Sequence, residues 1–313
     1  MRLFLATLII ALAAFATFGQ QAPTLRIVSE DGNNLPSELF YGNIKVKPLR
    51  LRPGTNVPIT INDPDFFVST HYVDFLSRFP DQAGFSFWQN DITQCGADAQ
   101  CAEVHRINVS ASFFLSIEFQ KTGFLVYKMY EAGFGLPAGS PVPVRREDFI
   151  PDTRTIGKDV VVGQQGWEAL LEANKNAFAL AFVQRPTFQA QFPANMTAQA
   201  FVDKLDSNTG NVLSTSDKSN LVQMLTGNPS DTTRANVVRQ VAENANLDQR
   251  EFRKAFVLMQ YFGYLRRNPN DAPDGNFAGF DFWLKKLNDF NGDFLQAEMV
   301  KAFLSSIEYN NRF

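Results

Sequence analysis

The sequence predicts a mainly α-helical fold, in which tandem helical repeat units (helix-turn-helix-helix) follow a small N-terminal β segment. Three observations predict it. Several segments of the chain resemble one another, as in repeat proteins. Apolar residues within these segments recur at helical spacing. The residues ahead of them alternate between apolar and polar, which is typical of strands.

Residues 1–22 have the order of a secretory signal peptide. Arg2 precedes the apolar run LFLATLIIALAAFATF, and the polar stretch GQQAP follows. Cleavage after Gly19 and cleavage after Ala22 both fit the small residues there. A retained membrane anchor is the alternative, but the run is shorter than the roughly 20 apolar residues that a span needs. We therefore expect an exported protein, extracellular or at the cell surface, with no membrane span after signal cleavage.

Residues 23–64 are expected to form the small β segment. The stretches TLRIV, NIKVKPLRLR and VPITI alternate in polarity, and the turn-forming sequences DGN and PG separate them. Asp63-Pro64 then leads into the first helix. Four basic residues are expected to lie on a solvated strand face or to contact an anionic surface polymer: Lys45, Lys47, Arg50 and Arg52.

The strongest internal similarity joins two distant parts of the chain. FVSTHYVDFLSRFP at Phe67 returns as FVLMQYFGYLRRNP at Phe256, GFSFWQNDI returns as GFDFWLKKL, and FFLSIEF returns as FLSSIEY. These blocks share 14 identities in 30 aligned pairs. Two weaker copies begin near Val126 and Val202. The expected units are residues 65–122 (unit 1), the degenerate units 123–200 (unit 2) and 201–250 (unit 3), and residues 251–313 (unit 4).

Units 1 and 4 begin with an amphipathic helix. Apolar residues spaced i, i+4, i+7 and i+8 give it one apolar face: Val68, Tyr72, Phe75 and Leu76, and Val257, Tyr261, Tyr264 and Leu265. Pro80 and Pro269 then end that helix, because proline lacks the backbone donor. The last helix of each unit is expected to carry two aromatic residues: Phe113 and Phe119 in unit 1, and Phe303 and Tyr309 in unit 4.

Cys95 and Cys101 are the only cysteines in the sequence. Because we expect export and the two are close in the chain, a disulfide is the simplest interpretation. Metal binding would need more ligands, and only His105 is near. The corresponding loop of unit 4 is the shorter NDFNGD, in which Asn291-Gly292 predicts a tight turn. The disulfide is therefore predicted to be structural.

Two pairs of opposite charges recur in units 1 and 4. Arg78 and Glu118 in the first return as Arg267 and Glu308 in the last. Guanidinium matches carboxylate in a two-pronged geometry, so we predict structural ion pairs that join the end of the first helix to the last helix. A pair of catalytic acids is the alternative for the two glutamates, although each belongs to its own unit.

Other chemistry has few candidates in the sequence. The motifs HExxH and GxSxG, a phosphate-binding glycine loop and a paired CxxC are missing. Of the two histidines, His71 falls on an apolar helix face and is expected to be packed, at the position that Gln260 occupies in unit 4. No cofactor is expected. A net charge of −3 lacks the basic footprint of nucleic-acid binding.

The turn after Pro269 is a weak calcium candidate. Its side-chain oxygens are of the type that calcium prefers, in the residues Asn270, Asp271, Asp274 and Asn276. They do not fit the EF-hand register, and a turn-forming role explains them equally well. No metal is assigned.

The repeated residues resemble a bacterial extracellular module catalogued as domain of unknown function 4214. Its pattern runs Val, Leu-Tyr, Leu-Gly-Arg, Pro-Asp, Gly, Trp and Ser-x-Glu-Phe. Unit 1 matches it at Val68, Tyr72, Leu76, Arg78, Pro80, Asp81, Gly84, Trp88, Ser116, Glu118 and Phe119, and unit 4 at Val257, Tyr261, Leu265, Arg267, Pro269, Gly279, Trp283, Ser306, Glu308 and Tyr309. Departures are His71 and Gln260 for the leucine, and Ser77 and Arg266 for the glycine.

The resemblance covers most of residues 65–313. It implies helical modules on secreted or surface proteins, distantly like the linker helices of phycobilisomes, and it brings no activity with it. We therefore expect a secreted or cell-envelope structural or interaction protein without catalytic activity. Its partner would be an envelope or extracellular protein or a polysaccharide. The alternative is an extracellular glycan-binding or glycan-processing hydrolase.

Overall fold

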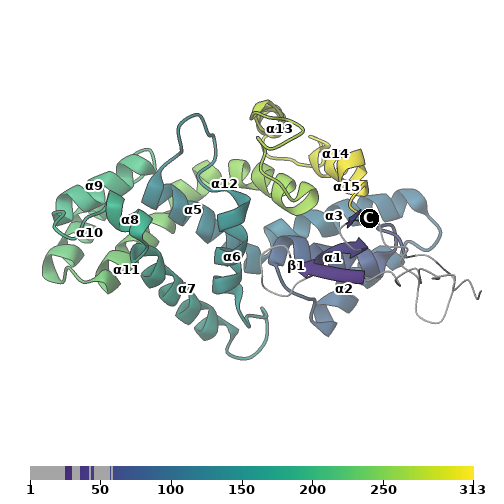
Figure 1. The fold of residues 1–313 in the computed structure, drawn as a ribbon, viewed down its shortest axis with the longest axis horizontal. Helices are drawn as coiled ribbons and strands as arrows, with labels where there is room; N and C mark the ends of the chain where they lie inside the picture. The colour runs from purple at the N-terminus through teal and green to yellow at the C-terminus, as the bar shows by residue number, and fades with distance from the viewer. Residues whose placement is uncertain (1–24, 30–35, 42–43, 46–56, 58) are drawn as a thin grey trace, which may run out of the picture.

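The computed structural model describes the backbone of residues 25–29, 36–41 and 44–45, and the complete residues 57 and 59–313 (Figure 1). The signal peptide expected at residues 1–22 lies outside the described residues, as do the side chains of the basic residues of the β segment. No helix in the described part of the chain is long and apolar enough to cross a membrane.

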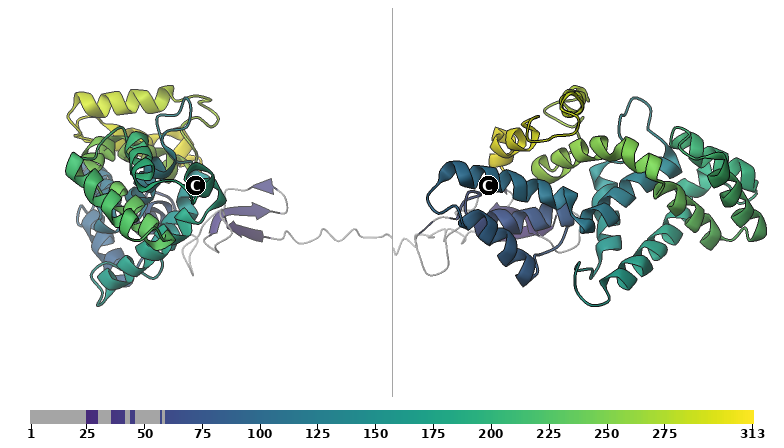
Figure 2. Two further views of the ribbon diagram at one scale, coloured as in Figure 1. Left: turned by 90° about the vertical axis from the view of Figure 1, so that its left-hand side faces the viewer. Right: turned by 180° about the vertical axis from the view of Figure 1, so that it is seen from behind.

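Three short strands precede the helices, drawn in purple in Figure 2. They pair antiparallel in the order β1 (Leu25–Ser29), β2 (Pro36–Tyr41) and β3 (Ile44–Lys45). The strand expected at VPITI is wrong, because the described residues there have no strand structure. Instead, the backbone N–H of Thr60 donates to the Asp63 carboxylate at 2.6 Å, and this turn leads into the first helix.

The rest of the described chain is mainly helical. Unit 1 contains α1 (Pro64–Leu76), α2 (Gln82–Thr93), α3 (Ala99–Leu115) and α4 (Ile117–Lys121). The middle contains α5 (Gly123–Phe134), α6 (Arg146–Gly157), α7 (Trp167–Val183), α8 (Pro186–Gln191), α9 (Ala198–Asn208), α10 (Thr215–Gly227) and α11 (Asp231–Ala242). The last part contains α12 (Ala245–Met259), its π-helical continuation η1 (Gln260–Leu265), α13 (Ala278–Asp289), α14 (Met299–Ser305) and α15 (Ile307–Asn310).

The first and the last helices lie at the same end of the molecule (Figure 1). Helix α1 packs against η1, and α3 packs against α14, so the first and last parts of the helical chain lie side by side. Helices α7 to α11 form the opposite end of the elongated molecule, and α5 and α12, which pack against each other, lie between the two ends (Figure 1).

A buried ionic cluster joins the first part to the last. The Asp74 carboxylate of α1 accepts hydrogen bonds from Arg266 at 2.7 and 2.9 Å and from Arg312 at 2.7 and 3.0 Å. Its side chain is only 3% exposed. Nearby, the Ser110 hydroxyl of α3 hydrogen-bonds the Tyr264 hydroxyl of η1. Polar and charged contacts therefore fix how α1 and α3 sit on η1.

The helix expected to close each unit is in fact two helices. In unit 1, Phe113 lies on α3 and Phe119 on α4, and Ser116 between them is extended. The Ser116 hydroxyl accepts a hydrogen bond from the backbone N–H of Phe119, and Ser306 does the same for Tyr309 in unit 4. The serine of the Ser-x-Glu-Phe motif is thus an N-cap, which starts a new short helix.

One backbone feature follows the starting valine of every expected unit. Each valine is fully buried: Val68, Val126, Val202 and Val257. Nine residues later the chain adopts a left-handed conformation with φ between 52° and 69°: Ser77, Gly135, Asn211 and Arg266. This conformation ends a helix and favours glycine, which explains the glycine of the motif. Ser77 and Arg266 keep it without being glycine.

Two expected unit boundaries fall inside helices. The boundary at 200/201 lies within α9, and the boundary at 250/251 lies within α12. The reason is that α12 begins at Ala245, well before the repeated Phe256-Val257, and its first half packs against α5. Helix α12 is therefore shared by the two expected units on either side of residue 250.

We predict unequal outcomes for glycine at two of the left-handed positions, Ser77 and Arg266. Glycine relieves about 1 kcal/mol of left-handed strain and adds roughly 0.5–1 kcal/mol of unfolded-state freedom, so Ser77→Gly should change stability by less than about 1 kcal/mol. Arg266→Gly also removes a guanidinium from Asp74 and should cost about 2 kcal/mol. Urea unfolding of both variants measures the difference. Equal effects would mean that the contact between Arg266 and Asp74 contributes nothing.

Candidate functional site

The structure brings both predicted charge pairs together as two-pronged contacts. Arg78 donates from Nε and Nη2 to the two carboxylate oxygens of Glu118, at 2.6 and 2.7 Å. Arg267 donates in the same way to Glu308, at 2.6 and 3.1 Å. Glu118 is 8% exposed and Glu308 is 35% exposed. The pair in unit 1 is therefore the better shielded from solvent.

A tyrosine and a glycine surround each pair. The Arg78 guanidinium lies 4.9 Å from the ring centre of Tyr72, and that of Arg267 lies 5.3 Å from Tyr261. A Cβ atom added at Gly84 would overlap the hydroxyl of Tyr72, and at Gly279 it would lie 2.7 Å from that of Tyr261. The Tyr, Arg, Gly and Glu of the repeated motif thus form one packed group in unit 1 and another in unit 4. Their role is to close the unit.

The middle of the chain holds a third group of this kind that the sequence analysis missed. Arg185 donates to both carboxylate oxygens of Asp152, at 2.7 and 2.8 Å, and to the hydroxyl of Tyr130 at 2.9 Å. Tyr130 corresponds to Tyr72 in the repeat, but here the carboxylate precedes the arginine in the chain. The reversed order hides this group from a comparison of repeated segments. The recurring tyrosine, Tyr130, is the feature of the sequence that could have indicated it.

His71 is buried and hydrogen-bonded at both ring nitrogens. Nδ1 lies 2.8 Å from the carbonyl oxygen of Phe67, and Nε2 lies 2.8 Å from the hydroxyl of Ser110. Burial lowers the pKa of His71 to about 4, although the Phe67 carbonyl and the Asp74 charge oppose this. At 1% exposure, this serine–histidine contact cannot reach a substrate. It is a packed histidine.

Two buried carboxylates face each other between α5 and α12. Glu251 accepts hydrogen bonds from Tyr127 at 2.9 Å and from Arg250 at 2.7 Å, and Arg250 also contacts Glu131. Burial raises the pKa of Glu131 to about 7, and the charge of Glu251 adds to the rise while Arg250 opposes it. Sequence analysis gave no signal for this group. Because Glu131 is 2% and Glu251 0% exposed, the group shapes stability rather than offering an open catalytic acid.

The side chains of the calcium candidate make protein contacts. The Asp271 carboxylate accepts from Asn268 and from Arg145, at 2.8 and 3.0 Å. Asp274 accepts from Arg267 at 2.8 Å. The Asn276 side chain accepts the backbone N–H of Ala278 at 2.8 Å, at the start of α13.

These contacts tie the enlarged turn to α6. Asn268 is 3% exposed and also donates to the Glu147 carboxylate at 3.1 and 3.2 Å. The carboxylates of Asp271 and Asp274 thus accept hydrogen bonds from cationic and amide donors of the protein itself. The turn therefore holds the end of η1 against the start of α6.

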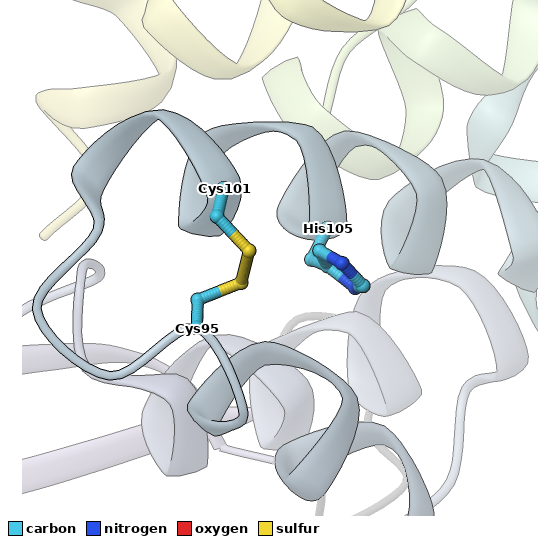
Figure 3. Close-up of side chains that lie close together, drawn as sticks. All are labelled: Cys95, Cys101 and His105. Atoms are coloured by element: carbon cyan, nitrogen blue, oxygen red, sulfur yellow. A yellow bond between two sulfur atoms is a disulfide. The ribbon is translucent and has the colours of Figure 1, made fainter.

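Cys95 and Cys101 form a disulfide between the loop after α2 and the first turn of α3 (Figure 3). His105 lies one turn further along α3, beside the two sulfur atoms. In unit 4, Asn291 and Gly292 both have positive φ, as the tight turn predicted for that shorter loop requires. The cystine loop is thus a longer connection at the same place in the motif.

A groove of about 620 Å³ lies between the end of α1 and the region from α6 to Val161. Arg78, Arg154 and Lys158 line it together with apolar residues. Phe79 at its edge is 59% exposed. Asp81 and Asp159 line it as well, so the groove presents both basic and acidic side chains beside an exposed aromatic ring.

Exposed aromatic rings recur at one position of the motif. Phe87 is 63% exposed and Phe282 is 58% exposed. Each packs edge-on against the motif tryptophan that follows it, Trp88 at 4.8 Å and Trp283 at 5.1 Å between ring centres. Large exposed aromatic side chains are typical of interaction surfaces.

We predict unequal costs for breaking the two arginine–glutamate pairs. Glu118→Gln should lower the free energy of unfolding by about 3 kcal/mol, because it strands a charge in a shielded pair. Glu308→Gln should cost about 1 kcal/mol in its more exposed pair. Lysine at Arg78 or Arg267 should not substitute fully, since it lacks the two-pronged geometry. Double-mutant cycles test this, and zero coupling energy in both pairs would contradict it.

We predict that His71 weakens the protein in acid. Its folded pKa of about 4 lies below its ordinary value of 6.5, so its contribution is complete above pH 6.5 and is lost as the pH falls toward 4. His71→Gln should remove this loss, because Gln260 makes the same bond to the carbonyl four residues earlier. Glu131 has the opposite effect. Its contribution to the stability of the protein is complete below pH 4.5 and is lost as the pH rises to about 7.

The measurement is the difference in unfolding free energy between wild type and His71→Gln at each pH from 4 to 8. Taking this difference cancels the contribution of Glu131, which both proteins share. A difference that stays constant across this range would contradict the prediction.

Comparison of the chain with models of protein families, with curated proteins and with solved structures finds no match.

Proposed function

We propose that the protein is an exported structural or interaction protein of the cell envelope or extracellular space, built from four tandem helical units. The observation that carries this proposal is the recurrence of an exposed phenylalanine beside a half-buried tryptophan, at Phe87 and Phe282. The titratable motif residues, by contrast, are engaged in closing the units.

The repeat arrangement has support beyond the sequence. The starting valine of each unit is fully buried, and the ninth residue after it is left-handed in all four units. The tyrosine–arginine–carboxylate group occurs in units 1, 2 and 4. This recurrence also favours the resemblance to the bacterial extracellular module, which in turn favours export and a surface role.

The ring pairs suit binding for a physical reason. When a partner covers an exposed phenylalanine, apolar surface is removed from water. This burial favours binding by roughly 25 cal/mol per Å². The tryptophan beneath holds the ring in place, so little side-chain freedom is lost on binding. Two copies on one chain can also engage a repetitive partner such as a polymer at both positions, which strengthens weak single contacts.

The groove favours the second candidate, a glycan-binding or glycan-processing role. Phe79 offers a ring for stacking, and Arg154 and Lys158 offer donors for hydroxyl or acidic groups of a sugar, whereas the Arg78 guanidinium is engaged with Glu118. Of the two acidic residues that line the groove, Asp81 caps α2 through the backbone N–H of Gly84 at 2.8 Å, which leaves Asp159 as the exposed carboxylate, whereas glycoside hydrolysis ordinarily uses two. The groove thus suits sugar binding better than sugar cleavage.

The proposed binding role is tested by co-sedimentation with a purified envelope fraction from the producing cells. We expect wild type to sediment with the fraction and the double variant Phe87→Ser, Phe282→Ser to bind at least tenfold less. Leu170→Ser on α7 is the matched control, because Leu170 is also exposed, at 38%, but lies outside the repeated ring pair. Equal binding of wild type and the double variant would overturn the proposal.

Treatment of the fraction separates the two candidate functions. Loss of binding after protease treatment identifies a protein partner, whereas loss after glycan hydrolases identifies a polysaccharide. For the hydrolase alternative, we predict no turnover of glycoside, ester or peptide substrates. Turnover that Glu118→Gln or Glu308→Gln abolishes, in variants whose helical circular dichroism is retained, would show that the glutamates are catalytic.

A further inference from the structure

The loop between α2 and α3 gathers three metal-ligand atoms at one place. The sulfur atoms of Cys95 and Cys101 and a ring nitrogen of His105 all lie within 4.8 Å of one another (Figure 3). All three residues are half-buried. Cys101 and His105 are four residues apart on α3, which puts them on the same helix face. Two cysteines and one histidine form the ligand type that zinc prefers.

Local structure holds these residues in place. Helix α2 ends at Thr93, and Gly96 with φ of 57° turns the chain back. Asp98 caps α3 by accepting the backbone N–H of Cys101 at 3.0 Å. The Cys95 position is thus defined by a short loop between two helix ends, and the other two positions are defined by the first turns of a 17-residue helix.

A carboxylate orients the histidine. Nδ1 of His105 lies 3.0 Å from a carboxylate oxygen of Asp91 on α2. A carboxylate at this position accepts the N–H and leaves the lone pair on the other ring nitrogen, Nε2. Metal-binding histidines almost always have such a partner. A purely structural disulfide needs neither His105 nor Asp91.

We propose that the reduced form of this loop is a binding site for a divalent cation of the zinc class, with Cys95, Cys101 and His105 as ligands and Asp91 as the group that orients His105. A phosphine or dithiol reductant supplies two electrons, the S–S bond breaks, and each sulfur takes up a proton. The cation then displaces both thiol protons and binds two thiolates and the imidazole. Water occupies the fourth position of the tetrahedron.

The geometry needs little change for this. Zinc–sulfur bonds of about 2.3 Å place two tetrahedral sulfur ligands roughly 3.8 Å apart, and the three ligand atoms already lie within 4.8 Å. Breaking the S–S bond lets the sulfur atoms reach that spacing by side-chain rotation. Disulfide and metal exclude each other, because both use the same sulfur atoms. Metal binding therefore reports the redox state of the loop.

The fourth unit supports an added role for this loop. There the corresponding connection is closed by Asn291 and Gly292 in a tight turn, without cysteine or histidine. The helices on either side, α13 and α14, still form. Closing the unit therefore does not require the cystine loop, and its ligand residues call for another explanation.

The test is a titration of the full mature chain with Co²⁺ after reduction by a trialkylphosphine. We expect the charge-transfer band of cobalt thiolate and the visible bands of tetrahedral cobalt in the reduced protein, and neither in the oxidised protein. His105→Ala should weaken binding at least tenfold. Asp91→Asn should weaken it about 10- to 100-fold. His71→Gln is the matched control and should bind like wild type, because His71 is buried elsewhere.

Alkylation of the reduced protein gives a second readout. Zn²⁺ should protect both thiols from iodoacetamide in wild type and not in His105→Ala. Circular dichroism follows the helices throughout. Cobalt binding by reduced wild type that equals binding by His105→Ala would overturn the proposal. So would the absence of thiolate bands, or a loss of helical structure on reduction, since the site depends on α2 and α3 staying in place.

Discussion

The buried contact of Asp74 with Arg266 and Arg312 is the constraint on which the arrangement of the molecule depends. Burial alone would raise the pKa of Asp74, but the charges and hydrogen bonds of the two arginines hold it below its ordinary value. Removing ions from water is costly, so such a cluster persists only where its partners are fixed. Here the partners are Arg266, directly after η1, and Arg312, after α15. The cluster thereby selects one way of docking the last part of the molecule on the first.

In units 1 and 4, the motif residues have linked physical roles. The arginine pairs with a carboxylate, the tyrosine packs against the guanidinium, and the glycine leaves room for the tyrosine hydroxyl. A change at one of these positions therefore disturbs the others. The motif serine starts the short helix that carries the glutamate. It therefore sets how the carboxylate is placed relative to the arginine. This mutual dependence explains why these residue types recur together while their neighbours differ.

The sequence predicted the helical class, the starting helices and both arginine–glutamate contacts, because each depends on residues within one repeated block. It failed where distant contacts decide the structure. The break at Ser116 was missed because apolar spacing continues across it. The group formed by Asp152 and Arg185 was missed because its order in the chain is reversed. Glu131 and Glu251 lie on helices distant in sequence, and no local pattern pairs them. VPITI alternates like a strand, but the bond from Thr60 to Asp63 turns it toward α1 instead.

The contact between the two ends of the helical chain has a mechanical consequence. The ring of Phe66 near the start of α1 lies 5.6 Å from the ring of Phe313, the last residue. A force that pulls Phe66 and Phe313 apart loads the contacts of α1 with η1 and with Arg312 and Phe313 directly, while α7 to α11 lie away from this region (Figure 1). Ion pairs and interlocked rings at that interface resist such a pull together. Helices α7 to α11 would bear tension only after these contacts of α1 had broken.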